Sequence, residues 1–277
     1  MKNFIRTMAM LAVCALAFWG CTDKNSAQPG KTFTVGFDAE FPPYGFLDAK
    51  SGEHKGFDLD LAAEVCKRNG WTLVKKPIDW AAKDSELNAG TIDCIWNGFT
   101  ITDERKDLYT WTEPYVSNLQ QVLVKKDSGI TKLADLKGKV IVAQDGSSGV
   151  GAIKDYLKEQ KEKDATFVEK ELKLVPDYNT ASTMLESGAV DAIALDSAVA
   201  EGLMKKSNGK FVILAENLVN EKFGVGFKKG NTELRDTVQK TLKEMVTDGT
   251  CKKILEHWAT AEKENGGAGI DFILTAE

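Results

Sequence analysis

The segment Leu87-Asn-Ala-Gly90-Thr-Ile-Asp93-Cys-Ile95 occurs a second time in altered form, as Leu185-Glu-Ser-Gly188-Ala-Val-Asp191-Ala-Ile193. The leucine, glycine, aspartate and isoleucine of the two copies are each separated by 98 residues. In each copy the pattern predicts the end of a helix, a glycine that stops it and a short buried strand. A repeated helix–glycine–strand unit predicts two lobes that are built alike.

Different polar residues follow the two copies. After the first come Asn97, Gly98, Thr100 and Arg105, which offer hydroxyl, backbone and guanidinium groups, and after the second comes Asp196. Ligands of open α/β sheets bind beyond the carboxyl ends of the strands. One lobe therefore presents a cation and the other an anion across a gap, and this pair of charges suits a zwitterion such as an amino acid.

The composition places the chain among soluble globular proteins. It has 277 residues, of which 43% are hydrophobic and 28% charged, and its formal net charge is −5. This length allows one large domain or two of ordinary size. A net acidic chain without a stripe of Lys and Arg argues against nucleic acid as a partner. His54 and His257 are far apart in the sequence, which predicts no metal site, and no motif predicts a cofactor.

The N-terminus predicts export. Lys2 and Arg6 precede an unbroken apolar run of 12 residues from Met8 to Trp19. A membrane-spanning helix needs about 20 apolar residues, so this run fits the core of a signal peptide instead. We expect a signal peptide over residues 1–20 and a mature protein in the periplasm or on the outer face of the cell membrane.

Five cysteines divide into two groups. Gly20 and Cys21 end the apolar run and resemble the lipobox of bacterial lipoproteins, which predicts lipidation of Cys21 and a polar tether over residues 21–31. Cleavage after Ala15-Leu16-Ala17 is the alternative. Beyond the tether, Cys66 and Cys94 are expected to be small core residues, and the role of Cys251 and any pairing stay open.

Strands and helices alternate along the mature chain, which predicts an α/β fold with mostly parallel sheets. We expect lobe 1 to comprise residues 31–120 plus 226–277 and lobe 2 to comprise residues 121–225, with the tail after Gly266 unassigned. The predicted strands are 32–37, 71–75, 115–125, 139–144, 172–175, 191–195 and 223–227. The predicted helices run from an N-cap at Asp58 to 68, up to Gly90, up to 163, and over 181–187, 197–205, 232–247 and 251–258.

Seven motifs follow one another in a familiar order. They are Val35-Gly-Phe-Asp-Ala-Glu-Phe-Pro-Pro-Tyr44, Gly56-Phe-Asp-Leu-Asp-Leu61, Gly98-Phe-Thr-Ile-Thr-Asp-Glu-Arg105, Glu113-Pro-Tyr115, Leu133-Ala-Asp-Leu-Lys-Gly138, Gly146-Ser-Ser-Gly149 and Asp248-Gly-Thr250. Over about residues 32–260 the chain resembles the polar amino-acid-binding proteins of bacterial ABC importers, the family 3 extracellular solute-binding proteins. The resemblance implies a two-lobed periplasmic-binding-protein-like fold, or Venus flytrap, with two hinge crossings. It also implies a monomer that closes on one amino acid and delivers it to the permease subunits of an ABC transporter.

The resemblance further implies a role for each site residue. Arg105 would hold the ligand α-carboxylate through its planar fork, and the helix start at Ser147 and Ser148 would bind the same group. Asp196 would take the α-ammonium, and Thr100 and Gly98 would share the α-groups. Asp38, Phe41 and Trp80 would line the side-chain pocket near Asn97.

Structural roles are the alternatives for these residues. Arg105 could pair with a neighbouring acid in Asp103-Glu104, the serines could cap a helix, Asp196 could cap the helix that follows it, and Phe41 and Trp80 could be core aromatics.

Two other functions are alternatives on the same fold. Some of its members are dehydratases of cyclohexadienyl acids, for which Asp38 or Glu40 would supply the catalytic acid. A ligand sensor that acts through another chain is the second alternative. Gly146-Ser-Ser-Gly-Val150 does not fit the G-x-S-x-G pattern of hydrolases. We therefore expect a binding protein rather than an enzyme.

Overall fold

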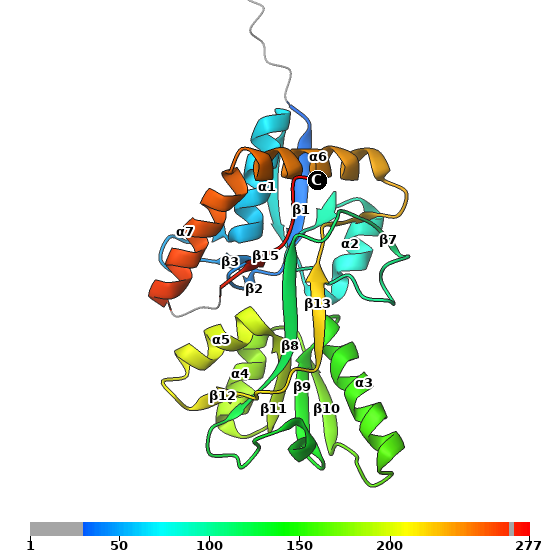
Figure 1. Cartoon of the computed structure of the whole chain (residues 1–277), viewed down its shortest axis with the longest axis vertical. Helices are drawn as coiled ribbons and strands as arrows, with labels where there is room; N and C mark the ends of the chain where they lie inside the picture. The colour runs from blue at the N-terminus through cyan, green and yellow to red at the C-terminus, as the bar shows by residue number, and fades with distance from the viewer. Residues whose placement is uncertain (1–29, 266–268) are drawn as a thin grey trace, which may run out of the picture. The chain divides into compact units, whose positions relative to one another are not determined.

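The computed structural model describes residues 30–265 and 269–277 (Figure 1). Contacts divide the chain into two units, Met1–Gly30 and Lys31–Glu277. The predicted signal peptide, Cys21 and almost all of the tether lie outside the described residues. Within the described residues, no helix is both long enough and apolar enough to cross a membrane.

The first sheet is mixed and has the strand order β5-β1-β6-β14-β7. Its strands are β1 (Thr32–Phe37), β5 (Thr72–Pro77), β6 (Cys94–Ile95), β7 (Tyr109–Trp111) and β14 (Gly226–Lys228). β1 pairs in parallel with β5 and β6, whereas β14 runs antiparallel to β6 and β7. Around this sheet lie α1 (Phe57–Asn69), α2 (Lys83–Ala89), α6 (Thr232–Thr247) and α7 (Thr250–Asn265) (Figure 1).

The second sheet has the central order β10-β9-β11-β8-β12. Its strands are β8 (Val116–Lys125), β9 (Val140–Gln144), β10 (Glu171–Val175), β11 (Ala192–Asp196) and β12 (Phe211–Ile213). Two further strands, β13 (Val219–Phe223) and β15 (Asp271–Phe272), also pair with β8. The helices α3 (Ser148–Lys163), α4 (Tyr178–Ser187) and α5 (Ser197–Lys206) lie around this sheet (Figure 1).

Smaller elements complete the fold. The strands β2 (Glu40–Phe41), β3 (Gly45–Leu47) and β4 (His54–Lys55) form a three-stranded sheet after β1. The 3₁₀ turns η1 (Trp80–Ala82) and η2 (Leu133–Leu136) precede α2 and β9.

The two copies of the repeated segment adopt the same local structure. Gly90 and Gly188 end α2 and α4 with φ of 74° and 80°, in the left-handed region where glycine avoids the Cβ clash. The repeated aspartates also make equivalent hydrogen bonds. An Asp93 oxygen accepts from the Thr34 amide and an Asp191 oxygen accepts from the Val140 amide, both at 2.7 Å. The repeat therefore marks equivalent positions in the two sheets, as predicted.

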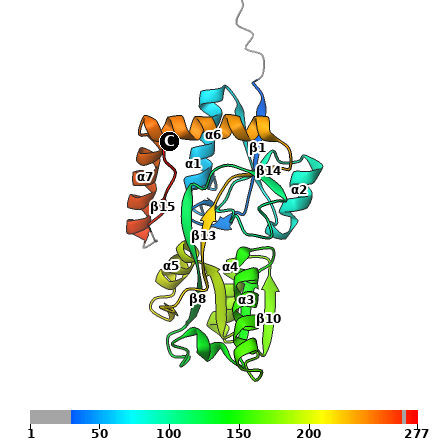
Figure 2. The ribbon, with the colours of Figure 1, turned by 45° about the vertical axis from the view of Figure 1, so that its right-hand side comes forward.

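Two strands connect the sheets. β8 starts directly after the first sheet, and β13 lies antiparallel beside it from Val116 to Gln120 (Figures 1 and 2). The single strand predicted over residues 223–227 is wrong, because β13 ends at Phe223 and β14 starts in the first sheet at Gly226. The chain thus changes sheets at Gly224-Val225. We propose that residues 31–120 plus 226–277 form lobe 1 and that residues 121–225 form lobe 2.

Two predictions about local structure need correction or extension. Asp58 is not the N-cap of α1; Gly56 holds that position, and Asp58 is fully buried inside the first turn. The unassigned tail contributes β15, whose Phe272 ring lies 6.0 Å from the Phe57 ring in an edge-on contact. The tail therefore packs against the start of the hinge strand β8.

The remaining cysteines lie in the core. Cys66, Cys94 and Cys251 are free and buried, with at most 2% of their surface exposed, which confirms the prediction for the first two. Burial raises the pKa of the Cys66 thiol to about 11 and that of Cys251 to about 12. In the described part of the chain, no group of His, Cys, Asp and Glu is arranged to hold a metal ion.

Candidate functional site

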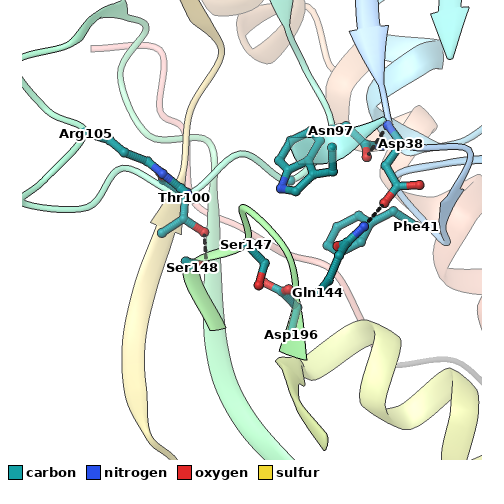
Figure 3. A pocket seen from close by; sticks show the side chains of 11 residues that line it. Asp38, Phe41, Asn97, Thr100, Arg105, Gln144, Ser147, Ser148 and Asp196 are labelled. Carbon is teal, nitrogen blue, oxygen red and sulfur yellow. Dashed lines mark hydrogen bonds between the residues drawn. The ribbon is translucent and has the colours of Figure 1, made fainter. Parts of the chain in front are cut away.

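All ten predicted ligand-binding residues line one pocket (Figure 3). Lobe 1 contributes residues after β1, in β2, in η1 and after β6, and lobe 2 contributes the end of β9, the start of α3 and the end of β11. The sequence missed one lining residue, Gln144. The lining consists of Asp38, Phe41, Trp80, Asn97, Gly98, Thr100, Arg105, Gln144, Ser147, Ser148 and Asp196.

Direct contacts between the two lobes close this pocket. Arg105 Nη2 donates to the Gly146 carbonyl at 2.8 Å, and the hydroxyl oxygens of Thr100 and Ser148 lie 3.1 Å apart. Gln144 Nε2 donates to Asp38 Oδ2 at 2.5 Å. The cavity that remains has a volume of about 10 Å³, which is room for about one water molecule. This volume is far too small for an amino acid.

Arg105 is held by carbonyl groups rather than by carboxylates. Besides Gly146 it reaches the Thr100 carbonyl at 3.3 Å, and its guanidinium carbon lies 5.1 Å from the centre of the Phe99 ring. Burial lowers the pKa of Arg105. The alternative partner Asp103 pairs instead with Lys106, at 2.7 Å. The guanidinium thus has no direct carboxylate partner among the described residues.

Ser147 and Ser148 form the start of α3. Ser147 occupies the N-cap position, but its side chain caps no backbone amide, and its buried hydroxyl oxygen has no hydrogen-bond partner in the described structure. A helix start offers free N–H groups and a partial positive charge. The serines lie at such a helix start opposite Thr100, and their role in binding a carboxylate stays a prediction.

Asp196 ends β11 and is buried in a set of polar side chains. Its Oδ1 accepts from Asn118 Nδ2 at 2.7 Å and from Gln120 Nε2 at 2.8 Å, and its Oδ2 accepts from the Tyr178 hydroxyl at 3.3 Å. Burial, followed by the nearby charge of Glu221, raises the pKa of Asp196 to about 7. Asp196 occupies the N-cap position of α5, but its side chain makes no cap hydrogen bond to this helix.

The other end of the pocket combines a carboxylate, amides and aromatic rings. Burial raises the pKa of Asp38, while hydrogen bonds from Gln144 and from the Glu40 amide oppose the shift. Asn97 Oδ1 accepts from the Asp38 amide at 3.1 Å. Phe41 and Trp80 are both largely buried and also line the pocket. Each ring therefore packs in the core and also lies at its predicted position in the pocket.

Asp58 supports the site from behind. Its Oδ2 accepts from the Gly98 amide and from the Tyr115 hydroxyl, both at 2.7 Å. Gly98 itself has a φ of 56°, and a Cβ there would lie 2.6 Å from the Phe41 ring. The buried carboxylate therefore fixes the loop that carries Gly98 and Thr100.

Replacing Asp58 with asparagine is expected to change how stability depends on pH. Burial raises the pKa of Asp58 from 3.8 to about 7, so the folded protein binds this proton more tightly than the unfolded chain. The contribution to stability is complete at low pH and is lost as the pH rises from about 4 to about 7, by at most about 1.4 kcal/mol per pH unit. The variant should lose this part of the slope in urea unfolding between pH 4.5 and 7.5. Exposed Asp127→Asn should match the wild type, and parallel curves for Asp58→Asn and the wild type would contradict the assignment.

Several residues around the site have weak or no signals in the sequence. Asn118 and Gln120 stand two apart in β8 and so share one face of the strand, a pattern that could have marked them. Lys83 is buried and donates to the Gly146 carbonyl at 2.9 Å, and burial lowers its pKa to about 8. Glu221 contacts the site from β13, and nothing in its neighbours in sequence points to it.

Comparison with known proteins identifies the family. The model for bacterial extracellular solute-binding proteins, family 3, matches residues 33–261. The L-cystine-binding protein TcyJ of Escherichia coli K12 is 30% identical over 260 residues, which cover 92% of this chain and 94% of that protein. An ancestral arginine-binding protein solved with arginine is 38% identical, with a TM-score of 0.75 over 83% of this chain and 99% of the other.

A second solved structure gives the same result. A histidine-bound substrate-binding protein of an ABC uptake transporter from Streptococcus pneumoniae is 33% identical, with a TM-score of 0.75, and the match covers 82% of this chain and 92% of that one. These structures confirm the two-lobed periplasmic-binding-protein fold predicted from the sequence. The chain belongs to the bacterial extracellular solute-binding proteins of family 3.

Proposed function

We propose that this protein captures a polar L-amino acid between its two lobes and delivers it, as a monomer, to the permease of an ABC importer. One observation carries the proposal: Arg105 of lobe 1 and Asp196 of lobe 2 line the same pocket, with the hydroxyls of Thr100 and Ser148 beside them. A cation and an anion that lack direct charged partners suit the carboxylate and the ammonium of an amino acid.

The ligand side chain would extend toward Asp38. The lining of the pocket then holds two carboxylates, Asp38 and Asp196, against one guanidinium, Arg105. The α-groups of an amino acid neutralise one carboxylate and the guanidinium, which leaves Asp38. Because an uncompensated buried charge is costly, a ligand with a cationic side chain is favoured. The arginine-bound relative supports the same choice.

A thermal-shift screen of the twenty amino acids and cystine tests the proposal. A ligand at 100 times its dissociation constant adds about 2.7 kcal/mol of apparent stability, which for a protein of this size raises the melting temperature by about 5–10 °C. Arginine and lysine are expected to give the largest shifts. Shifts with sugars or peptides alone would contradict the proposal. A separate incubation with prephenate tests the dehydratase alternative. Turnover of prephenate would favour an enzyme over a binding protein.

The proposal includes a lipid anchor on Cys21, which lies outside the described residues. A lipoprotein cysteine carries a diacylglyceryl group, and two acyl chains give the stable hold that one chain does not. Cys21→Ser is expected to move the protein from the membrane fraction to the soluble fraction, whereas Cys14→Ser, within the signal peptide, should leave it at the membrane. A mature N-terminus at Phe18 with an unmodified Cys21, seen by mass spectrometry, would contradict the anchor.

A further inference from the structure

Glu221 brings a further carboxylate into the centre of the site. It lies on β13, one of the two strands that connect the sheets, and is half-buried. Its Oε2 accepts hydrogen bonds from Thr100 Oγ1 at 3.1 Å and from Ser148 Oγ at 3.2 Å. The same oxygen accepts from Asn118 Nδ2 and from Gln120 Nε2, each at 3.1 Å. One oxygen thus contacts hydroxyls that line the pocket from both lobes.

Glu221 and Asp196 share their amide partners. Asn118 Nδ2 and Gln120 Nε2 each donate to both carboxylates, at 2.7 and 2.8 Å on the Asp196 side. Two carboxylates held by the same donors repel each other, and this repulsion adds to burial in raising the pKa of Asp196. In the described part of the chain neither carboxylate forms an ion pair, since Arg105 donates to backbone carbonyls.

A cation placed between the carboxylates of Asp196 and Glu221 would offset their repulsion. An ammonium group has three N–H donors, and Asp196, Glu221 and the Thr100 hydroxyl supply three acceptors. Placed there, it would replace a repulsion between like charges with two ion pairs. Glu221 also lines a neighbouring cavity of about 480 Å³ that shares Thr100, Arg105, Ser147 and Ser148 with the pocket, so a ligand has access to it.

We propose that Glu221 is a second carboxylate of the α-ammonium site, so that the ligand nitrogen is shared between Asp196 on β11 and Glu221 on the hinge strand β13. This inference rests on the proposed capture of an amino acid. It also gives the hinge strand a direct contact with the ligand, because Glu221 lies on the segment that connects the lobes.

A different role for Glu221 makes the opposite prediction. Its carboxylate could stand in for the ligand α-carboxylate, since it accepts from the hydroxyls of Thr100 and Ser148. A stand-in has to be displaced, so removing its charge would strengthen ligand binding. A carboxylate that binds the ammonium gives weaker binding after the same change.

Glu221→Gln is tested with two probes that differ only at the α-position. Calorimetry measures the binding of L-arginine and of its 2-hydroxy counterpart, which keeps the carboxylate and the guanidinium. The variant should lose about 10- to 100-fold in affinity for arginine, the range that a hydrogen bond between charged groups supplies. It should lose less than about threefold for the hydroxy acid, because no ammonium remains to be bound. Glu53→Gln, the same change at an exposed turn, should leave both affinities unaltered.

The possible outcomes distinguish the proposed role of Glu221 from the proposed capture of an amino acid. Equal losses for both probes, or tighter binding of arginine by Glu221→Gln, would overturn the role of Glu221 while leaving amino-acid capture intact. A wild-type protein that binds none of the twenty amino acids would overturn the proposed function and this inference together. The crystal structure of the wild-type complex is the second measurement. It should place a Glu221 oxygen within hydrogen-bond distance of the α-nitrogen, and a Glu221 bonded only to protein groups would overturn the inference.

Discussion

Arg105→Ala is expected to reduce the affinity for the amino acid by more than about 100-fold. The change leaves the ligand carboxylate buried without its cation, and losing one partner of a buried ion pair costs about 3–5 kcal/mol. The contact between the lobes survives the change, because Lys83 Nζ still donates to the same Gly146 carbonyl at 2.9 Å. The lost affinity, measured by calorimetry, therefore reports on the carboxylate site rather than on closure alone.

Two further variants sharpen the result for Arg105. Arg105→Lys should recover only part of the affinity, because an ammonium lacks the planar fork that matches a carboxylate. Arg235→Ala removes a guanidinium that lies outside the pocket, where it pairs with Asp236, and should bind as the wild type does. Near-wild-type affinity for Arg105→Ala would show that the carboxylate binds elsewhere.

Asp196→Asn is expected to weaken binding strongly while leaving the ligand-free protein as stable as before, or more stable. Truncating one partner of a buried, hydrogen-bonded charge pair costs about 2–5 kcal/mol of affinity. The asparagine oxygen still accepts from Asn118 and Gln120, and the neutral amide removes the repulsion from Glu221. Calorimetry measures the first effect, and thermal unfolding without ligand measures the second.

The effect of Asp196→Asn on stability should depend on pH. Burial raises the pKa of Asp196 to about 7. Ionised Asp196, which predominates above that pH, therefore lowers the free energy of unfolding. The stabilisation by asparagine should therefore be larger at pH 8 than at pH 5. Asp127→Asn, at an exposed position, serves as the control. Unchanged affinity, or a marked loss of stability at pH 8, would contradict the assignment of Asp196 as the ammonium site.

The parts of the fold that follow local rules could be predicted from the sequence. The repeated Gly90 and Gly188 end helices because glycine takes the left-handed conformation without strain, and the aspartate that follows each one accepts a hydrogen bond from the neighbouring strand, β1 or β9. The break at Gly224-Val225 could not be predicted, because the same apolar residues suit one long strand or two short ones. The tail strand β15 has no pattern of its own and forms only through pairing with β8.

The site also contains residues that could be predicted from the sequence and residues that could not. Asp196 ends β11 and the two serines follow β9, where the topology of α/β sheets places ligands, and Arg105 lies in the loop between β6 and β7. An acid before an apolar helix predicts a helix cap at Asp58, whereas in the structure Asp58 reaches Gly98 across 40 positions in the sequence. Glu221 contacts Thr100 and Ser148 from 121 and 73 positions away. Contacts at such separations depend on the assembled lobes, so the local sequence carries no trace of them.

The proposed function places one amino acid between Arg105 and Asp196 with its side chain toward Asp38. The crystal structure of the mature chain with L-arginine, or with the amino acid that gives the largest thermal shift, tests this claim most directly. We expect a bidentate carboxylate on Arg105 beside the start of α3, the α-nitrogen within hydrogen-bond distance of Asp196, and a side chain that ends at Asp38. A ligand bound outside the pocket, or inside it with the carboxylate turned away from Arg105, would overturn the proposed binding mode.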